Sequence, residues 1–188
     1  MAVMAPIAAN PAAQEISREH PNLSLALRSI IDEVDDDATC RLPSDLTVEL
    51  ESLLEWSFDE ITVQTEADEL IAAYVRCVPP DRAAQFLANL LPETERPSVR
   101  VFLLRGLAAT GHKVAVDSLV GHTSNNDVYM TLVSSDGVID VQRTVADAAA
   151  SLLQRLFPEV EASSPEGWSE WWRESKEPFT KVRGLPYN

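Results

Sequence analysis

The chain has 188 residues, of which 45% are hydrophobic and 24% charged, and its formal net charge is −15. This length fits one domain with a sizeable core, and the composition predicts neither a membrane span nor a membrane partner. The acidic balance also argues against nucleic acid as a partner, because contacts to phosphates require an excess of Lys and Arg.

Residues 1–21 show no sustained hydrophobic period. Their apolar start has no preceding basic residue and is interrupted by Pro6 and Pro11, which is unlike a signal peptide. We therefore expect a disordered N-terminus and a cytoplasmic protein. The two cysteines, Cys40 and Cys77, are too few for a disulfide framework. We expect both to be small, free, buried or half-buried side chains that act neither as ligands nor as nucleophiles.

The acidic charge is concentrated in the first half of the chain. Residues 1–95 hold 19 acidic and 5 basic side chains, a net charge of −14, whereas residues 96–188 hold 11 and 10, a net charge of −1. These acids either keep the protein soluble or form a contact for a basic partner. Seven of them are the candidate partner-binding residues: Asp35, Asp36, Asp37, Asp59, Glu60, Asp68 and Glu69.

Helical periodicity begins at residue 22 and continues through the first half of the chain. Ser44 is a suitable N-cap for the second helix, Thr65 for the third, and the Pro79-Pro80 pair separates the third helix from the fourth. We read the segment between the second and third helices as an extended loop. The predicted helices span residues 22–34, 44–58, 66–78 and 81–91.

The stretch 97–121 predicts two short helices that pack against each other. The first carries an apolar stripe and ends at Gly111, which suits the left-handed conformation; the second runs from about residue 112 to 120. One pair this small cannot bury its own apolar faces, so similar pairs must stack on both sides of it, as in a solenoid. The stripe of the first helix consists of Val99, Leu103, Leu104 and Leu107.

This stretch resembles a unit of the HEAT-repeat family, with the pattern V-R-x-x-L-x-x-G-L-A-A-T-G followed by K-V-A-V-D-S-L-V. A like stripe returns 42 positions later, at Val141, with Gln142 in the place of the family's Arg. The segment G-W-S-E-W-W is similar to the closing helix of some bacterial HEAT-like proteins. The resemblance implies an all-α fold, a short right-handed α-solenoid of HEAT-like helix pairs over residues 22–176.

Residues 122–137 separate the two units. We expect a short extra helix there, begun by Asn125 or Asn126, at a position where repeat proteins often carry a binding loop. A long helix is then predicted over 139–157 and ended by Pro158. Because the stripes along the chain are helical and no alternating strand pattern is sustained, we expect no sheet.

The last predicted helix begins after Ser164, with Pro165 in its first position, and residues 177–188 read as an extended tail on the surface. Three tryptophans share one face of this helix, Trp168, Trp171 and Trp172. We expect them to cap the open end of the last repeat against the preceding helix; the alternative is an aromatic hot spot for a partner.

No catalytic constellation is found, and we predict no catalytic residue, cofactor or metal. A metal site assembled from His112, His122, Asp117 and Asp127 is conceivable, but residues of this kind are usually exposed and unrelated. The first functional hypothesis is therefore a non-enzymatic protein-interaction module, scaffold or assembly factor. The alternative is an acidic inhibitor or immunity-type protein that neutralises a basic enzyme. A lyase or hydroxylase of HEAT architecture is the third, and the absence of His-Glu pairs counts against it.

Overall fold

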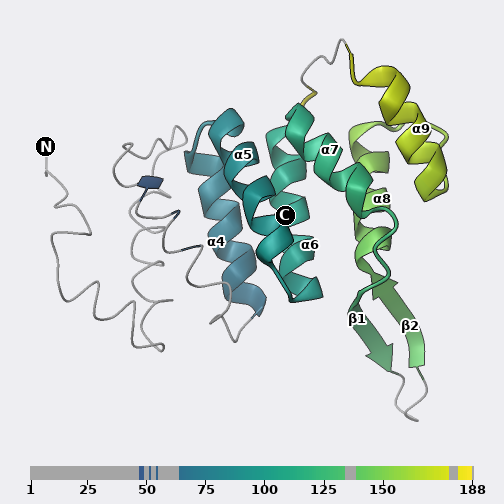
Figure 1. The fold of residues 1–188 in the computed structure, drawn as a ribbon. Helices are drawn as coiled ribbons and strands as arrows, with labels where there is room; N and C mark the ends of the chain where they lie inside the picture. Colours follow the sequence, from purple (N-terminus) through teal and green to yellow (C-terminus); the bar gives the residue numbers. More distant parts are fainter. Residues whose placement is uncertain are drawn as a thin grey trace, which may run out of the picture. The chain divides into compact units, whose positions relative to one another are not determined.

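The computed structural model describes residues 64–133, 139–177 and 182–187, together with four helical positions, Thr47, Val48, Glu51 and Leu54. The chain divides into two compact units, residues 1–79 and 80–188, and each is treated by itself. The described part is mostly helical, with six α-helices and one small two-stranded sheet (Figure 1). None of these helices is long and apolar enough to cross a membrane. The terminus predicted over 1–21 and the helix over 22–34 lie outside the described residues.

In the first unit, helix α4 spans Gln64–Cys77. Its Tyr74 is fully buried and donates a hydrogen bond of 2.7 Å from its hydroxyl to Oε1 of Glu51. The helix was correctly predicted, but it begins before Thr65, which therefore lies in the first turn instead of at the cap.

The expectation that Cys77 is a small buried side chain is confirmed, but the expectation that it is a free cysteine is wrong. This residue is buried, with 3% of its surface exposed, and it is disulfide-bonded. The only other cysteine of the sequence, Cys40, lies outside the described residues.

The second unit contains the other five helices, which follow one another in space as they do in sequence (Figure 1). Helix α6 packs against α5, α7 and α8, while α7 also packs against α5, α8 and α9. The elements are α5 (Pro80–Leu90), the short 3₁₀ helix η3 (Leu91–Glu93), α6 (Pro97–Thr110), α7 (Lys113–His122), α8 (Val145–Leu156) and α9 (Pro165–Ser175).

The predicted pair of helices at 97–121 is confirmed as α6 and α7. Gly111 ends α6 in the left-handed conformation, with a φ of 61°, which a residue with a Cβ rarely adopts. Nδ1 of His112 then caps α7 by accepting a hydrogen bond of 3.2 Å from the backbone N–H of Val114. Eight of the fourteen residues of α6 are buried: Val99, Val101, Leu103, Leu104, Gly106, Leu107, Ala108 and Thr110.

The prediction of a fold without a sheet is wrong. Strands β1 (Val128–Val133) and β2 (Ile139–Thr144) form an antiparallel hairpin where we expected an extra helix and the first part of a long one. Both segments alternate in polarity and are rich in β-branched residues, which favours strands once they can pair. Val141 and Gln142, placed by the HEAT resemblance at the start of a helix, lie in β2.

Helix α8 begins at Val145 because Thr144 and Asp147 form a capping box. The hydroxyl of Thr144 accepts a bond of 3.2 Å from the N–H of Asp147, whose carboxylate accepts one of 2.8 Å from the N–H of Thr144. These reciprocal bonds satisfy two of the free N–H groups at the helix start, so they separate the strand from the helix at this residue.

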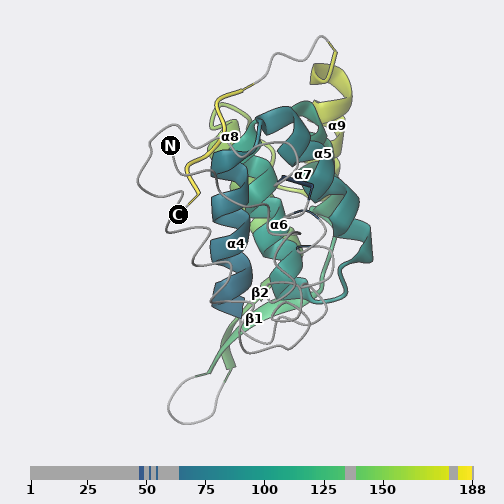
Figure 2. The same cartoon turned by 90° about the vertical axis from the view of Figure 1, so that its left-hand side faces the viewer.

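Residues 182–187 have no regular secondary structure and lie against α6, where the N–H of Leu185 donates a hydrogen bond to the carbonyl oxygen of Ala108. Figure 2, turned by 90° from Figure 1, shows this segment running back beside the helices. The predicted helix that begins after Ser164 is also confirmed, because the hydroxyl of Ser164 accepts a bond from the N–H of Gly167 at the start of α9.

The buried face of α6 generates a stability prediction. Leu107 is fully buried, so Leu107→Ala should lower the free energy of unfolding by about 2–5 kcal/mol in a urea titration. Leu132, which is 51% exposed on β1, supplies the matched control: Leu132→Ala should change stability by less than about 0.5 kcal/mol. Equal losses from the two changes would contradict the assignment of α6 to the core.

Candidate functional site

Most of the predicted acidic surface lies outside the described residues. Asp68 is half-buried in α4, and Glu69 lies in the same helix without a described side chain. The remaining five candidate acids fall outside the described residues: Asp35, Asp36, Asp37, Asp59 and Glu60. The acidic surface therefore stays a prediction.

The three tryptophans of α9 differ in exposure. Trp168 and Trp172 are buried, with 1% and 5% of their surfaces exposed, and Trp171 is half-buried. The ring of Trp171 contacts that of Phe157, which follows α8, with 4.7 Å between centroids. Trp168 meets Trp171 edge to face at 5.6 Å. This burial favours a packing role, and it leaves little aromatic surface for a partner.

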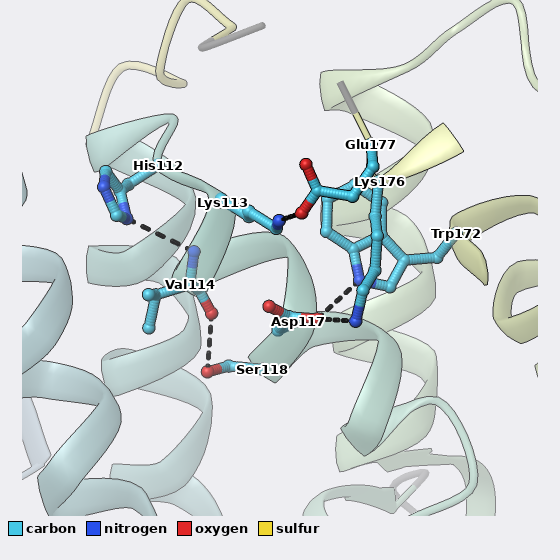
Figure 3. A network of polar contacts seen from close by, with 8 residues as sticks. All are labelled: His112, Lys113, Val114, Asp117, Ser118, Trp172, Lys176 and Glu177. Carbon is cyan, nitrogen blue, oxygen red and sulfur yellow. Dashed lines mark hydrogen bonds and ion pairs between the residues drawn. The ribbon is translucent and has the colours of Figure 1, made fainter. Parts of the chain in front are cut away.

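Polar contacts attach α9 to α7 along one seam (Figure 3). Nε1 of Trp172 donates a hydrogen bond of 2.6 Å to Oδ1 of Asp117, and Nζ of Lys176 lies 3.9 Å from the same oxygen. One turn away, Lys113 pairs with Glu177. Because Lys113 and Asp117 are four residues apart on α7, they face α9 together.

The four residues considered for a metal site are engaged separately. His112 caps α7, whereas Nδ1 of His122 lies 2.8 Å from the carbonyl oxygen of Ser118. Asp117 faces α9, and Asp127 pairs with an arginine of α6. In the described part of the chain, no group of three or more His, Cys, Asp or Glu residues could hold a metal ion.

The hairpin presents apolar side chains to solvent. Met130 and Leu132 lie on the same face of β1, because side chains alternate along a strand, and Val141 of β2 is paired directly opposite Leu132. These three side chains are 39%, 51% and 36% exposed, and we call them the apolar strand face. Val128, nearer the base, is 42% exposed.

The border of this face is polar and carries one charge. Arg143 is paired with Met130 across the hairpin, so it lies on the same side, and it is exposed. Thr131 and its partner Gln142 point to the opposite side and are exposed too. The hairpin therefore has one apolar side bordered by a cation and one polar side, and both sides meet solvent at these positions.

The base of the hairpin is fixed to the helices from two directions. The guanidinium of Arg100 on α6 donates bonds of 2.7 Å to Oδ2 of Asp127 and 2.6 Å to the carbonyl oxygen of Thr94. The N–H groups of Val145 and Ala146, at the start of α8, donate to the loop before β1. From this base the hairpin extends past the ends of α6 and α8 in both views (Figures 1 and 2).

Sequence reasoning missed this surface. The signals were present in the alternation of Val128, Met130 and Leu132 and in the T-x-x-D pattern that starts α8. Arg100 belongs to the repeat motif, yet its observed partners lie in the loop between η3 and α6 and in the loop before β1.

The anchor at the base of the hairpin can be tested with Arg100→Gln. Its side chain is 15% exposed and that of Asp127 is 55% exposed, so we expect a loss of about 1–2 kcal/mol in stability. Amide hydrogen exchange in 128–133 should become faster. The control is Arg105→Gln on the same helix, which should leave exchange in the hairpin unchanged; equal acceleration by both would contradict the anchor.

The seam between α7 and α9 calls for a double-mutant cycle of Trp172→Phe and Asp117→Asn. The first change removes the indole donor while keeping an aromatic ring, and the second weakens the acceptor. We expect a coupling energy of about 1 kcal/mol, because the hydrogen bond is charged but partly exposed to water. Additive losses in urea titrations would show that the contact contributes nothing to the attachment of α9.

The chain was also compared with models of known protein families, with characterised proteins and with solved structures. None of the three comparisons finds a match.

Proposed function

We propose that this protein is a non-enzymatic protein-interaction module built of HEAT-like helix pairs, which holds a partner protein on the apolar strand face. One observation carries the proposal: Met130, Leu132 and Val141 are exposed together on a hairpin whose base is fixed. Contiguous apolar side chains on a projecting element cost solubility unless a partner covers them, so such patches are typical of interaction sites.

The HEAT-like arrangement is part of the proposal. It is supported by the helix pair α6 and α7, joined at Gly111, and by the packing of α8 on both members of that pair. A regular repeat would enter the next helix directly, whereas here the hairpin intervenes between α7 and α8. We interpret the hairpin as an insertion on one face of the helical stack, where repeat proteins carry binding elements.

The partner should present an apolar surface bordered by a carboxylate. The apolar part would bury the apolar strand face, and the carboxylate would pair with the exposed Arg143 beside it. Charge complementarity at such a rim contributes more to the association rate and to specificity than to affinity. A second copy of this chain is a poorer occupant, because two molecules of net charge −15 repel each other.

The acidic inhibitor stays as the second candidate, favoured by the net charge of −14 over residues 1–95. In that case a basic enzyme would bind the first half of the chain. Its association rate would fall with added salt, since screening acts over about 8 Å at physiological ionic strength. The triple change of Asp35, Asp36 and Asp37 to Asn would slow association in the same way.

A photo-crosslinking side chain in place of Met130 tests the first proposal in the native cell. We expect one discrete protein to be captured. Thr131 supplies the control, because it is the next residue of the same strand and points to the opposite side. The same side chain at Thr131 should not capture that protein.

The captured protein is then purified and its affinity measured by calorimetry. The double variant Met130→Thr, Leu132→Thr should weaken binding by about 30- to 150-fold, since each change removes about 1–1.5 kcal/mol of apolar burial. The melting temperature should stay the same, because both side chains are exposed in the free protein.

Three results would count against the apolar strand face. Capture from Thr131 as strong as from Met130 would mean that the contact is not selective. The captured protein could also bind the Met130→Thr, Leu132→Thr variant with unchanged affinity and lose affinity in high salt or when Asp35, Asp36 and Asp37 are changed to Asn. That result would favour the hypothesis of an acidic inhibitor. Capture of a second copy of this chain would show that the apolar strand face mediates self-association and does not bind a different protein.

A further inference from the structure

A second surface of the same unit, separate from the hairpin, lies where residues 182–187 run along the end of α6. The N–H of Leu185 donates a hydrogen bond of 3.0 Å to the carbonyl oxygen of Ala108. Because α6 ends at Thr110, this carbonyl is one of the last four of the helix, which lack a partner within it. The segment therefore supplies an N–H group that the helix itself does not.

Two glycines determine how closely the segment approaches. A Cβ at Gly184 would overlap the carbonyl oxygen of Ala109, and a Cβ at Gly111 would overlap the carbonyl oxygen of Val182. Both clashes are with backbone atoms, so a rotamer change cannot relieve them. The surface therefore accepts only a residue without a side chain at position 184. We call this surface, formed by Arg105, Ala108, Ala109 and Gly111, the α6 seat.

An aromatic contact fixes the other end of the segment. The guanidinium of Arg105 lies 4.9 Å from the centroid of the Tyr187 ring, in cation–π geometry. Pro186, between this ring and Leu185, has a fixed φ and biases Leu185 towards the extended conformation. The segment is therefore partly preorganised, and it loses less conformational entropy when it binds than an ordinary peptide.

The segment contacts the seat with one side only. Arg183 and Pro186 are exposed, while Gly184, Leu185 and Tyr187 are half-buried. No residue of the segment is fully buried. Its removal would uncover part of the α6 surface without taking a side chain out of the core.

We infer that the α6 seat is a peptide-binding site and that residues 182–187 are its intramolecular ligand. The site takes an extended segment with a glycine, then an apolar residue that donates its N–H, then proline and an aromatic residue. A partner segment with this pattern binds by displacing residues 182–187. Because the ligand belongs to the same chain, its effective concentration is of the order of millimolar for a short link, so it occupies the seat until a competitor exceeds it.

The test uses the full-length chain and a fluorescein-labelled peptide of residues 182–188, VRGLPYN, followed by fluorescence anisotropy. Two variants release the chain's own ligand. Gly184→Val introduces the backbone clash, and Leu185→Pro removes the donor to Ala108. Both should remain folded by circular dichroism, and both should bind the peptide at least 10-fold more tightly than the wild type, in which the seat is occupied.

Matched controls locate the binding. In a released variant, the peptide with Val in place of its glycine should bind at least 10-fold more weakly. Arg105→Gln in that background should weaken the native peptide but not the peptide with Ala in place of its tyrosine, because the two groups form one contact.

Three outcomes would overturn the inference. The first is a folded, released variant that binds no peptide at millimolar concentration. The second is equal binding of the native and the glycine-substituted peptides, which would show that the close approach is not recognised. The third is loss of the folded state in both released variants, because residues 182–187 would then be part of the core and not an exchangeable ligand.

Discussion

Helix α6 has to be covered on almost every side, and the second unit is arranged around that requirement. A helix with eight buried residues among fourteen has no wide polar face to turn to water. Helices α5, α7 and α8 cover three sides, β1 lies against the helix as well, and residues 182–187 follow its last turns. The two surfaces proposed for binding therefore both belong to elements that lie against α6.

The helices could be predicted because their signals are local. Gly111 ends α6, Pro80 begins α5, and Ser164 caps α9, and each acts through its own backbone conformation or a bond to a neighbour in sequence. The hairpin could not be predicted with the same rules. The sequence of residues 128–133 is compatible with a helix as well as with a strand. The strand forms because it pairs with residues 139–144, and this pairing is not visible in a local pattern.

The candidate site was predictable to a smaller extent than the fold. Charge counts directed attention to acids such as Asp35 in the first half, whereas the apolar strand face is formed by residues that read as core. Leu132 has the same hydrophobicity whether buried or exposed, so only the pairing of its strand reveals its environment. Arg100 likewise reads as a motif residue, and its bonds to Asp127 and Thr94 depend on loops that sequence periodicity does not position.

The close approach of Gly111 and Gly184 also limits how this sequence can evolve. A steric conflict between two large residues can be relieved when one of them becomes smaller, so such pairs drift together. Here each position already carries the smallest residue, and the obstructing atoms belong to the backbone of the other segment. A side chain gained at either position therefore has no compensating substitution at the other. The two sites should drift only if the contact between the segments is lost altogether.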